Sequence, residues 1–194
     1  MELSIGILSG GKSRRMGRDK SKLLLHNKSF LDILVDEFAE FDDVLVSVSN
    51  SQTSKNYRTV MDEYEDYGPI EGIRQLLGHS KNPYMFICAT DMPFLKKELV
   101  YFLEQFLSQD YDVFIIESQG QVQPLCGIYS KSILPVISHV MKANEHRVKG
   151  ILKSVRLKKI SLKDSIFSVN MISNINTEDE YIKCLSSAIA LMEE

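Results

Sequence analysis

The sequence has few cysteines and no long apolar run, and both absences exclude classes of protein. Its three cysteines are odd in number, widely spaced and never arranged as C-x-x-C: Cys88, Cys126 and Cys184. This pattern excludes a disulfide framework and a cysteine zinc site, and it is typical of reduced thiols. No apolar run approaches the ~20 residues that a membrane-spanning helix requires. Because the first residues also lack the basic and apolar segments of a secretory signal, we expect a cytoplasmic protein without membrane contacts.

A strong net charge, repeats and linkers are lacking as well. The formal net charge is −3, whereas nucleic-acid-binding domains are usually basic, so we expect no nucleic-acid partner. No linker, repeat or low-complexity segment divides the 194 residues, and a chain of this length can bury a core of its own. The sequence therefore predicts a single domain over residues 1–194.

The most informative stretch lies close to the start of the chain. Residues 3–8 form a short apolar run that predicts a strand buried on both faces. Gly10 and Gly11 follow, and their freedom to turn lets successive backbone N–H groups face a bound anion. Six of the eleven residues 12–22 are basic, and Asp19 is the single acid among them. A strand that leads into a glycine turn and a cationic loop predicts a phosphate-binding site.

The same stretch also matches the P-loop pattern G-x-x-x-x-G-K-[ST] at residues 6–13. In a P-loop the first glycine ends the strand and a helix begins at the Lys-Ser pair. Here Gly6 lies inside the apolar run, and the residues after Ser13 have no apolar face at helical spacing. Gly17 would interrupt such a helix at a cost of about 1 kcal/mol. We therefore interpret the P-loop match as accidental.

Apolar runs and helical periodicities alternate along the chain. Strands are expected at residues 3–8, 43–49, 58–61, 84–89, 111–117, 123–129, 156–162 and 167–170. Helices are expected after Ser29 as an N-cap, after Gly68-Pro69, at 97–107 with Phe106 facing inward, at 132–143 and 147–153, and after a capping box at 177–180. Strands separated by such helices pair in parallel through right-handed crossovers. The sequence therefore predicts an α/β fold, a Rossmann-like three-layer α/β/α sandwich with a mostly parallel sheet.

Polar residues follow the predicted strands at the sheet edge where parallel α/β folds bind ligands. These residues are the Gly10-Gly11 pair, Asn50, Asp62 and Asp91. Asp91, at the tip of an apolar strand, could supply an oxygen ligand to a magnesium ion that also binds phosphates. The alternative is that Asp91 caps the turn into Met-Pro, which is good turn chemistry. The cationic loop expected at the same edge favours the metal interpretation.

Residues 8–20, LSGGKSRRMGRDK, resemble the signature L-[AS]-G-G-x-S-x-R-M-G-x-D-K of the molybdenum cofactor guanylyltransferases, within the wider nucleotidyltransferase superfamily. CATDMPF at 88–94 is similar to the family's C-x-x-D-M-P-F, whose aspartate binds the metal. Asp62 followed by GPIEG at 68–72 resembles the D…G-P-L-A-G segment around guanine and ribose. NINT at 174–177 resembles the N-[IV]-N-T segment before the last helix. The resemblance extends over nearly the whole chain and implies the nucleotidyltransferase type of fold.

The resemblance implies an enzyme that transfers GMP from GTP to the terminal phosphate of molybdopterin with Mg²⁺, releasing pyrophosphate. Its implied partners are GTP, molybdopterin, and the proteins that insert or accept the finished cofactor. The implied nucleotide-binding residues are Leu8, Ser9, Gly10, Gly11, Lys20, Asn50, Asp62, Gly68 and Asp91. The residues implied in catalysis are Lys20, Arg15 and Asp91. Those implied for the metal are Asp91 and Asn176, and those implied for the pterin are Arg147 and Asn174.

The match departs from the family pattern at two positions. Gln123 stands where the family often has His, and Glu71 replaces the usual Ala in G-P-L-A-G.

The four histidines are scattered without metal spacing, and we expect them at the surface or partly packed. Asp66 competes with Asp62 as the acid that binds the base.

Two other functions remain open. One is a nucleotidyltransferase of the same fold that transfers a cytidylyl group to molybdopterin or acts on a sugar phosphate. The other is a non-catalytic nucleotide-binding or cofactor-binding carrier. Lys20 together with Asp91 argues against a carrier, because binding alone does not require a metal-binding acid at the α-phosphate.

Overall fold

The computed structural model describes residues 3–9, 23–48, 57–64, 67–118, 120–163 and 165–190. Within these ranges, seven strands form one sheet in the order β5-β4-β1-β6-β8-β7-β9, and β2 pairs with β3 in a separate hairpin. The strands are β1 (Leu3–Ser9), β2 (Leu24–Leu25), β3 (Lys28–Ser29), β4 (Val44–Val48), β5 (Arg58–Met61), β6 (Tyr84–Ala89), β7 (Val113–Ser118), β8 (Gln121–Ser130) and β9 (Leu157–Ser161).

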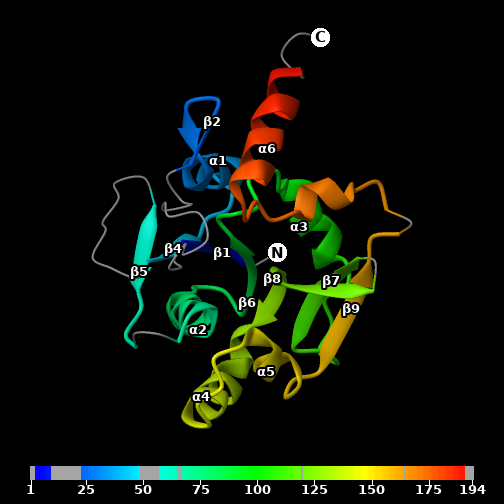
Figure 1. The fold of residues 1–194 in the computed structure, drawn as a ribbon. Coiled ribbons are helices and arrows are strands. Elements are labelled where there is room, and N and C mark those ends of the chain that lie inside the picture. Colours follow the sequence, from blue (N-terminus) through cyan, green and yellow to red (C-terminus); the bar gives the residue numbers. More distant parts are fainter. Residues whose placement is uncertain are drawn as a thin grey trace.

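Helices lie on both faces of this sheet (Figure 1). The α-helices are α1 (Phe30–Glu37), α2 (Pro69–His79), α3 (Lys97–Glu104), α4 (Leu134–Lys142), α5 (Val148–Leu152) and α6 (Glu178–Ala190), and the 3-10 helices are η2 (Lys131–Ile133) and η3 (Val169–Ile172). One core cluster joins the sheet to α1 and α3. A second core cluster joins its other face to α2, α4 and α5. The predicted three-layer sandwich with a mostly parallel sheet is therefore confirmed. In the described part of the chain, no helix is long and apolar enough to cross a membrane.

Strand β8 runs against the direction of its neighbours. It pairs antiparallel with β6 on one side and with β7 on the other, whereas β9 pairs parallel with β7. Two residues separate β7 from β8, too few for a parallel crossover, and Gly120 there has φ +75°. Cys88 and Cys126 face each other across β6 and β8 as free, buried thiols, and burial raises the pKa of both.

The predicted helix starts at both ends of the chain are confirmed by their caps. Ser29 is the N-cap of α1, and its hydroxyl accepts a 3.1 Å hydrogen bond from the Asp32 amide. Before α6, the Thr177 hydroxyl accepts from the Glu180 amide at 3.2 Å, and the Glu180 carboxylate accepts from the Thr177 amide at 3.0 Å. These reciprocal bonds form a capping box, which satisfies backbone donors that a helix start leaves unpaired.

Two local predictions are wrong. Residues 167–170, expected to form a strand, instead lead into the 3-10 helix η3. The Ser168 hydroxyl is the N-cap of η3 and accepts a hydrogen bond from the Asn170 amide. A side-chain cap of this kind competes with strand pairing for the backbone. Helix α3 ends at Glu104 rather than at 107, so Phe106 does not face the core and is 37% exposed. Its ring instead packs edge-on against Phe102, with centroids 5.2 Å apart.

Candidate functional site

The parallel strands bring the predicted site residues to one edge of the sheet. At this edge Ser9 of β1 pairs with Val48 of β4, and Val48 pairs in turn with Met61 of β5. On the other side of β1, Leu8 pairs with Ala89 of β6. Asp62 and Asp91 therefore follow strands that end beside the end of β1, as predicted. Several other predicted site residues lie outside the described residues: Gly10, Gly11, Arg15, Lys20, Asn50 and Asp66.

Asp91 is held by a segment that lies 83 residues further along the chain. The Asn174 side-chain amide donates to Asp91 Oδ1 at 2.8 Å, and the Ile175 backbone amide donates to the Asp91 carbonyl at 2.8 Å. Thr90, which lies between the end of β6 and Asp91, is anchored as well, because its amide and hydroxyl both donate to the Leu8 carbonyl. The half-buried Asp91 carboxylate is thus oriented by Asn174 at the end of the sheet.

This contact distinguishes the two asparagines that the family resemblance singles out. Asn174, predicted to face the pterin, contacts the predicted metal-binding acid directly. Asn176, predicted as a metal ligand, donates its backbone amide to Glu180 at 2.6 Å at the start of α6. Among the described residues, no group of three or more His, Cys, Asp and Glu side chains is arranged to hold a metal ion. A single carboxylate such as Asp91 nevertheless suits Mg²⁺, which binds through one or two carboxylates together with phosphates and water.

Asp62 occupies a half-buried position just beyond β5. Its Oδ1 accepts a 3.1 Å hydrogen bond from the Ser47 hydroxyl, and its backbone amide donates to the Val48 carbonyl at 3.1 Å. Burial raises the pKa of Asp62, and the negative charge of Glu71 adds to that rise. The hydrogen bond from Ser47 and the positive charge of Arg74 offset the rise only in part. Asp62 is thus an oriented acceptor in a partly desolvated place.

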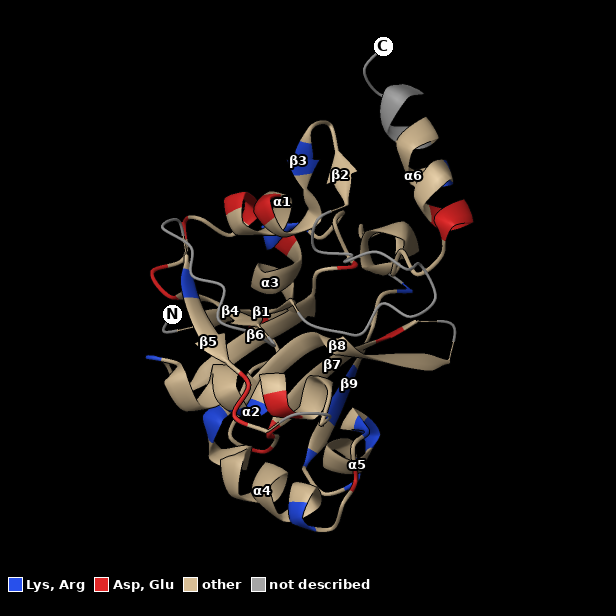
Figure 2. Cartoon of the chain, turned by 60° about the vertical axis from the view of Figure 1, so that its left-hand side comes forward, with Lys and Arg blue, Asp and Glu red and all other residues tan. Residues whose placement is uncertain are grey.

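Glu71, which departs from the family pattern, has a structural role that was not predicted from the sequence. Its side chain is fully buried on the first turn of α2, which begins after Gly68 at φ +59°. Glu71 accepts hydrogen bonds from the backbone amides of Glu63 and Tyr64, just after Asp62. The signal that could have revealed this role is the pair of donors at positions i+3 and i+4, Arg74 and Gln75. Figure 2 shows acidic residues gathered in the loop between β5 and α2.

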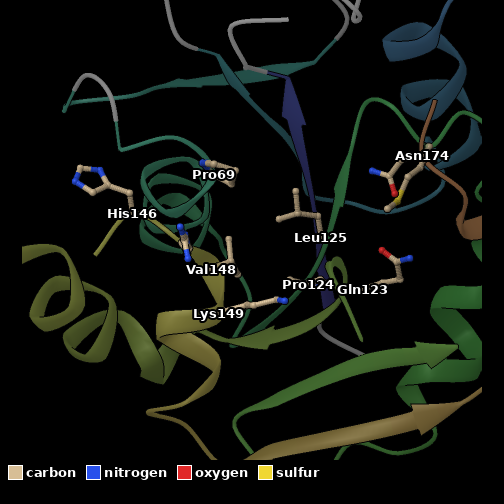
Figure 3. Close-up of a pocket in the computed structure, with 10 residues that line it drawn as sticks. Pro69, Gln123, Pro124, Leu125, His146, Val148, Lys149 and Asn174 are labelled. Atoms are coloured by element: carbon tan, nitrogen blue, oxygen red, sulfur yellow. The ribbon is translucent and has the colours of Figure 1, made fainter. Parts of the chain in front are cut away.

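A pocket of about 570 Å³ lies next to Asp91 and collects residues from five parts of the chain (Figure 3). Its volume is that of a small-molecule site. Arg147 and Asn174, the two residues predicted to face the pterin, both line it, and so does Gln123. The complete lining is Pro69, Met92, Gln123, Pro124, Leu125, His146, Arg147, Val148, Lys149 and Asn174. Apolar walls are thus combined with two cationic side chains and two amides.

His146 connects this pocket to the segment that precedes α2. It is exposed, as expected for the histidines, but it also lines the pocket, which was not predicted from the sequence. Its ring stacks on Tyr67 with centroids 4.7 Å apart and an interplanar angle of 21°. Tyr67 in turn packs edge-on against Tyr64, with centroids 6.2 Å apart. Aromatic contacts therefore link the loop beyond Asp62 to the pocket wall.

Comparison with known proteins shows the family to which the chain is related. Residues 5–160 match the family model of the MobA-like NTP transferase domain. A molybdenum cofactor guanylyltransferase of Campylobacter jejuni strain RM1221 is 30% identical over 185 residues, covering 94% of this chain and 95% of its own length. A probable molybdenum cofactor guanylyltransferase of Clostridium perfringens strain 13 is 31% identical over 190 residues, covering 92% and 93%.

Solved structures share the fold at lower sequence identity. Molybdopterin-guanine dinucleotide biosynthesis protein A from Archaeoglobus fulgidus has a TM-score of 0.85 at 19% identity, covering 96% of this chain and 99% of that one. The 2-C-methyl-D-erythritol 4-phosphate cytidylyltransferase from Thermus thermophilus has a TM-score of 0.71 at 14% identity, covering 97% and 100%. The same fold therefore occurs in proteins named for different nucleotides, so base preference depends on individual residues.

Proposed function

The chain belongs to the family of MobA-like NTP transferase domains, and from this premise we propose that it transfers GMP from GTP to the terminal phosphate of molybdopterin. The products are the guanine dinucleotide form of the cofactor and pyrophosphate. The names of the two bacterial relatives support this choice of substrates. The observation that carries the proposal is the contact between Asn174 and Asp91, because Asn174 also lines the pocket. An acid suited to Mg²⁺ therefore stands beside a space for an acceptor.

The proposed reaction needs no covalent intermediate with the protein. A phosphate oxygen of molybdopterin attacks the α-phosphorus of GTP in line, and the pyrophosphate leaves with the electron pair of the broken bond. The main obstacle is to bring two polyanions together in the right geometry. Lys20, Arg15 and the amides of Gly10 and Gly11 would hold the triphosphate and offset charge on the leaving group. These four residues enter the proposal through the sequence motif.

Asp91 is the proposed magnesium ligand, with Asn176 as a second predicted ligand. A bound Mg²⁺ would offset negative charge on the phosphate oxygens. The Asn174 side-chain amide keeps the Asp91 carboxylate oriented through Oδ1. This contact makes Asn174 a positioning residue for the proposed metal-binding acid.

The pocket beside Asp91 is the proposed acceptor site. Arg147 and Lys149 supply positive charge for the terminal phosphate of the acceptor. Pro69, Leu125 and Val148 supply apolar surface against which a ring system can lie. Amide side chains at the same wall can pair with the polar edge of a pterin.

Asp62 is the proposed acceptor for the guanine base. Its carboxylate can accept from both the N1–H and the exocyclic amine of guanine, and cytosine offers no such pair of donors. A site built around a hydrogen-bonding acceptor rejects a base that leaves the acceptor unpaired. The Asp62→Asn variant should therefore lose much of its preference for GTP over CTP. An unchanged preference in that variant would contradict this role.

The first test is pyrophosphate release from GTP, CTP and ATP in the presence of Mg²⁺, each with and without molybdopterin. We expect release from GTP only when molybdopterin is present. Release from CTP instead would favour cytidylyl transfer. Mg²⁺-dependent GTP binding without any release would favour a carrier.

Asp91→Ala tests the site within the same assay. We expect turnover to be abolished without loss of the fold, because the variant removes the proposed metal-binding carboxylate. The matched control is Asp112→Asn, which alters an acid at the opposite edge of the sheet, paired with Arg156 at 2.6 Å. The control should keep near-normal turnover. A near-normal rate in Asp91→Ala would refute the assignment of Asp91.

A further inference from the structure

We propose that Glu71 is a positioning residue that sets the base selectivity of this site, because it holds the backbone that directly follows Asp62. The inference deepens the proposed function and rests on it, since it takes Asp62 as the acceptor for guanine. It concerns a residue at which this chain departs from the family pattern that it otherwise resembles.

The Glu71 carboxylate binds the backbone of the two residues that follow Asp62. Its Oε1 accepts from the backbone amide of Glu63 at 2.8 Å and from that of Tyr64 at 3.3 Å. These are the two residues that follow Asp62, and the Asp62 amide itself extends the sheet by donating to the Val48 carbonyl. The backbone is therefore fixed on both sides of the proposed base acceptor.

Glu71 is in turn fixed by side chains from its own helix. Arg74 donates from Nε to Oε2 at 2.7 Å and from Nη2 to Oε1 at 2.8 Å, and Gln75 donates to Oε1 at 2.8 Å. Burial alone would raise the pKa of Glu71, but the hydrogen bonds from Arg74, Gln75 and the Glu63 amide outweigh it and lower the pKa. The group therefore remains an anion at neutral pH. A buried anion tolerates little displacement, because it loses its compensating partners when it moves.

Arg74 also contacts the side chains of the same two residues, Glu63 and Tyr64. It pairs with the Glu63 carboxylate at 2.6 Å, and its guanidinium lies 5.1 Å from the centre of the Tyr64 ring. Tyr64 and Glu63 are thus held by their backbone amides and by their side chains at once. The arrangement presets the loop before any nucleotide binds, and such preorganisation reduces the ordering cost of binding.

If the role of Glu71 were merely structural, its replacement would lower stability without changing base preference. The chain offers a matched control for this outcome in Asp43. Asp43 is 1% exposed, accepts from Ser4 at 2.7 Å and from the Lys81 amide at 2.9 Å, and pairs with Arg58. It precedes β4 and therefore lies at the opposite edge of the sheet from Asp62. Asp43→Asn should lower stability without any change in base preference, because it disturbs a buried carboxylate far from the proposed base site.

The test compares Glu71→Gln with Asp43→Asn in the transfer assay with GTP and CTP. Glutamine keeps the size of the side chain but cannot accept from Arg74 at both terminal atoms. We expect the KM for GTP to rise roughly tenfold, the equivalent of about 1.4 kcal/mol, with little change in kcat. The preference for GTP over CTP in kcat/KM should fall by a similar factor. Gln75→Leu, which removes one donor to Glu71 at similar volume, should shift the preference in the same direction by less.

Hydrogen exchange gives a second readout that needs no substrate. In Glu71→Gln the amides of Glu63 and Tyr64 should exchange faster than in the wild type, and in Asp43→Asn their rates relative to the other loops should be unchanged. An unchanged GTP preference in a folded Glu71→Gln variant would overturn the inference about Glu71 alone. A wild-type protein that released no pyrophosphate from GTP with molybdopterin would instead overturn the proposed function, and with it the selectivity role.

Discussion

Gly72 and Gly78 lie on the same helix, α2, and replacing each by alanine should change stability in opposite directions. A Cβ on Gly72 would lie 2.5 Å from Leu8 Cδ2 and 2.9 Å from Ser47 Oγ, closer than packed side chains approach. A Cβ on Gly78 would meet no atom within 4 Å. The first substitution therefore forces α2 or the Leu8 and Ser47 side chains to move, whereas the second adds only a better helix former.

The magnitudes follow from the two effects. Overpacking a core costs about 1–3 kcal/mol, and two contacts below 3 Å put Gly72→Ala near the upper end. Exchanging Gly for Ala inside a helix returns about 1 kcal/mol, so the expected net loss is roughly 2 kcal/mol. For a chain of this size, that loss lowers Tm by about 4–8 °C. Gly78→Ala carries no steric cost and should gain up to about 1 kcal/mol, less because it is next to the end of the helix.

Thermal and denaturant unfolding of the two variants test this reasoning side by side. Because Ser47 donates to Asp62, its displacement in Gly72→Ala should also raise the KM for GTP, whereas Gly78→Ala should leave KM unchanged. If Gly72→Ala were as stable as Gly78→Ala, the close approach of α2 to the sheet would not be the reason for a glycine at position 72.

Two further predictions concern the acids at the site. Asn174→Ala should lower kcat roughly tenfold or more, because Asp91 loses the hydrogen bond that orients its carboxylate. The unfolding free energy should fall by no more than the about 1.5–3 kcal/mol that a hydrogen bond to a charged group contributes. Steady-state rates at saturating GTP and denaturant unfolding check the two effects. Because burial raises the pKa of Asp62 above its ordinary ~3.9, GTP affinity should fall on acidification through that raised pKa, and Asp62→Asn should abolish this dependence in binding titrations. Folding stability should change with pH in the opposite direction to GTP affinity. Because the pKa of Asp62 is higher in the folded than in the unfolded chain, ionised Asp62 destabilises the folded protein at neutral pH. Asp62→Asn should therefore be more stable than wild type at neutral pH, and it should lose that advantage below about pH 4, where Asp62 is protonated in both states.

Local patterns were sufficient for most of the secondary structure. The apolar run at Tyr84–Ala89 forms β6 with the predicted bounds, and Ser29 caps α1 through its own hydroxyl. Such features depend on residues within one turn or one strand, so neighbouring residues encode them. The prediction at 167–170 is wrong for a related reason: an apolar run suggests a strand, but whether it pairs depends on a partner strand elsewhere in the chain.

The sequence by itself determined the order of the elements, the edge of the sheet at which Asp62 and Asp91 end up, and the family to which the chain belongs. The tertiary structure decided which distant side chains meet: Asn174 on Asp91, Glu71 beneath the residues after Asp62, and Arg147 in the same pocket as Asn174. The physical reason is that the packing of helices and strands sets the distances between residues that are far apart in the sequence. A hydrogen bond across 83 residues leaves no periodic trace in the sequence, and it forms only after the packed sheet has brought its two partners together.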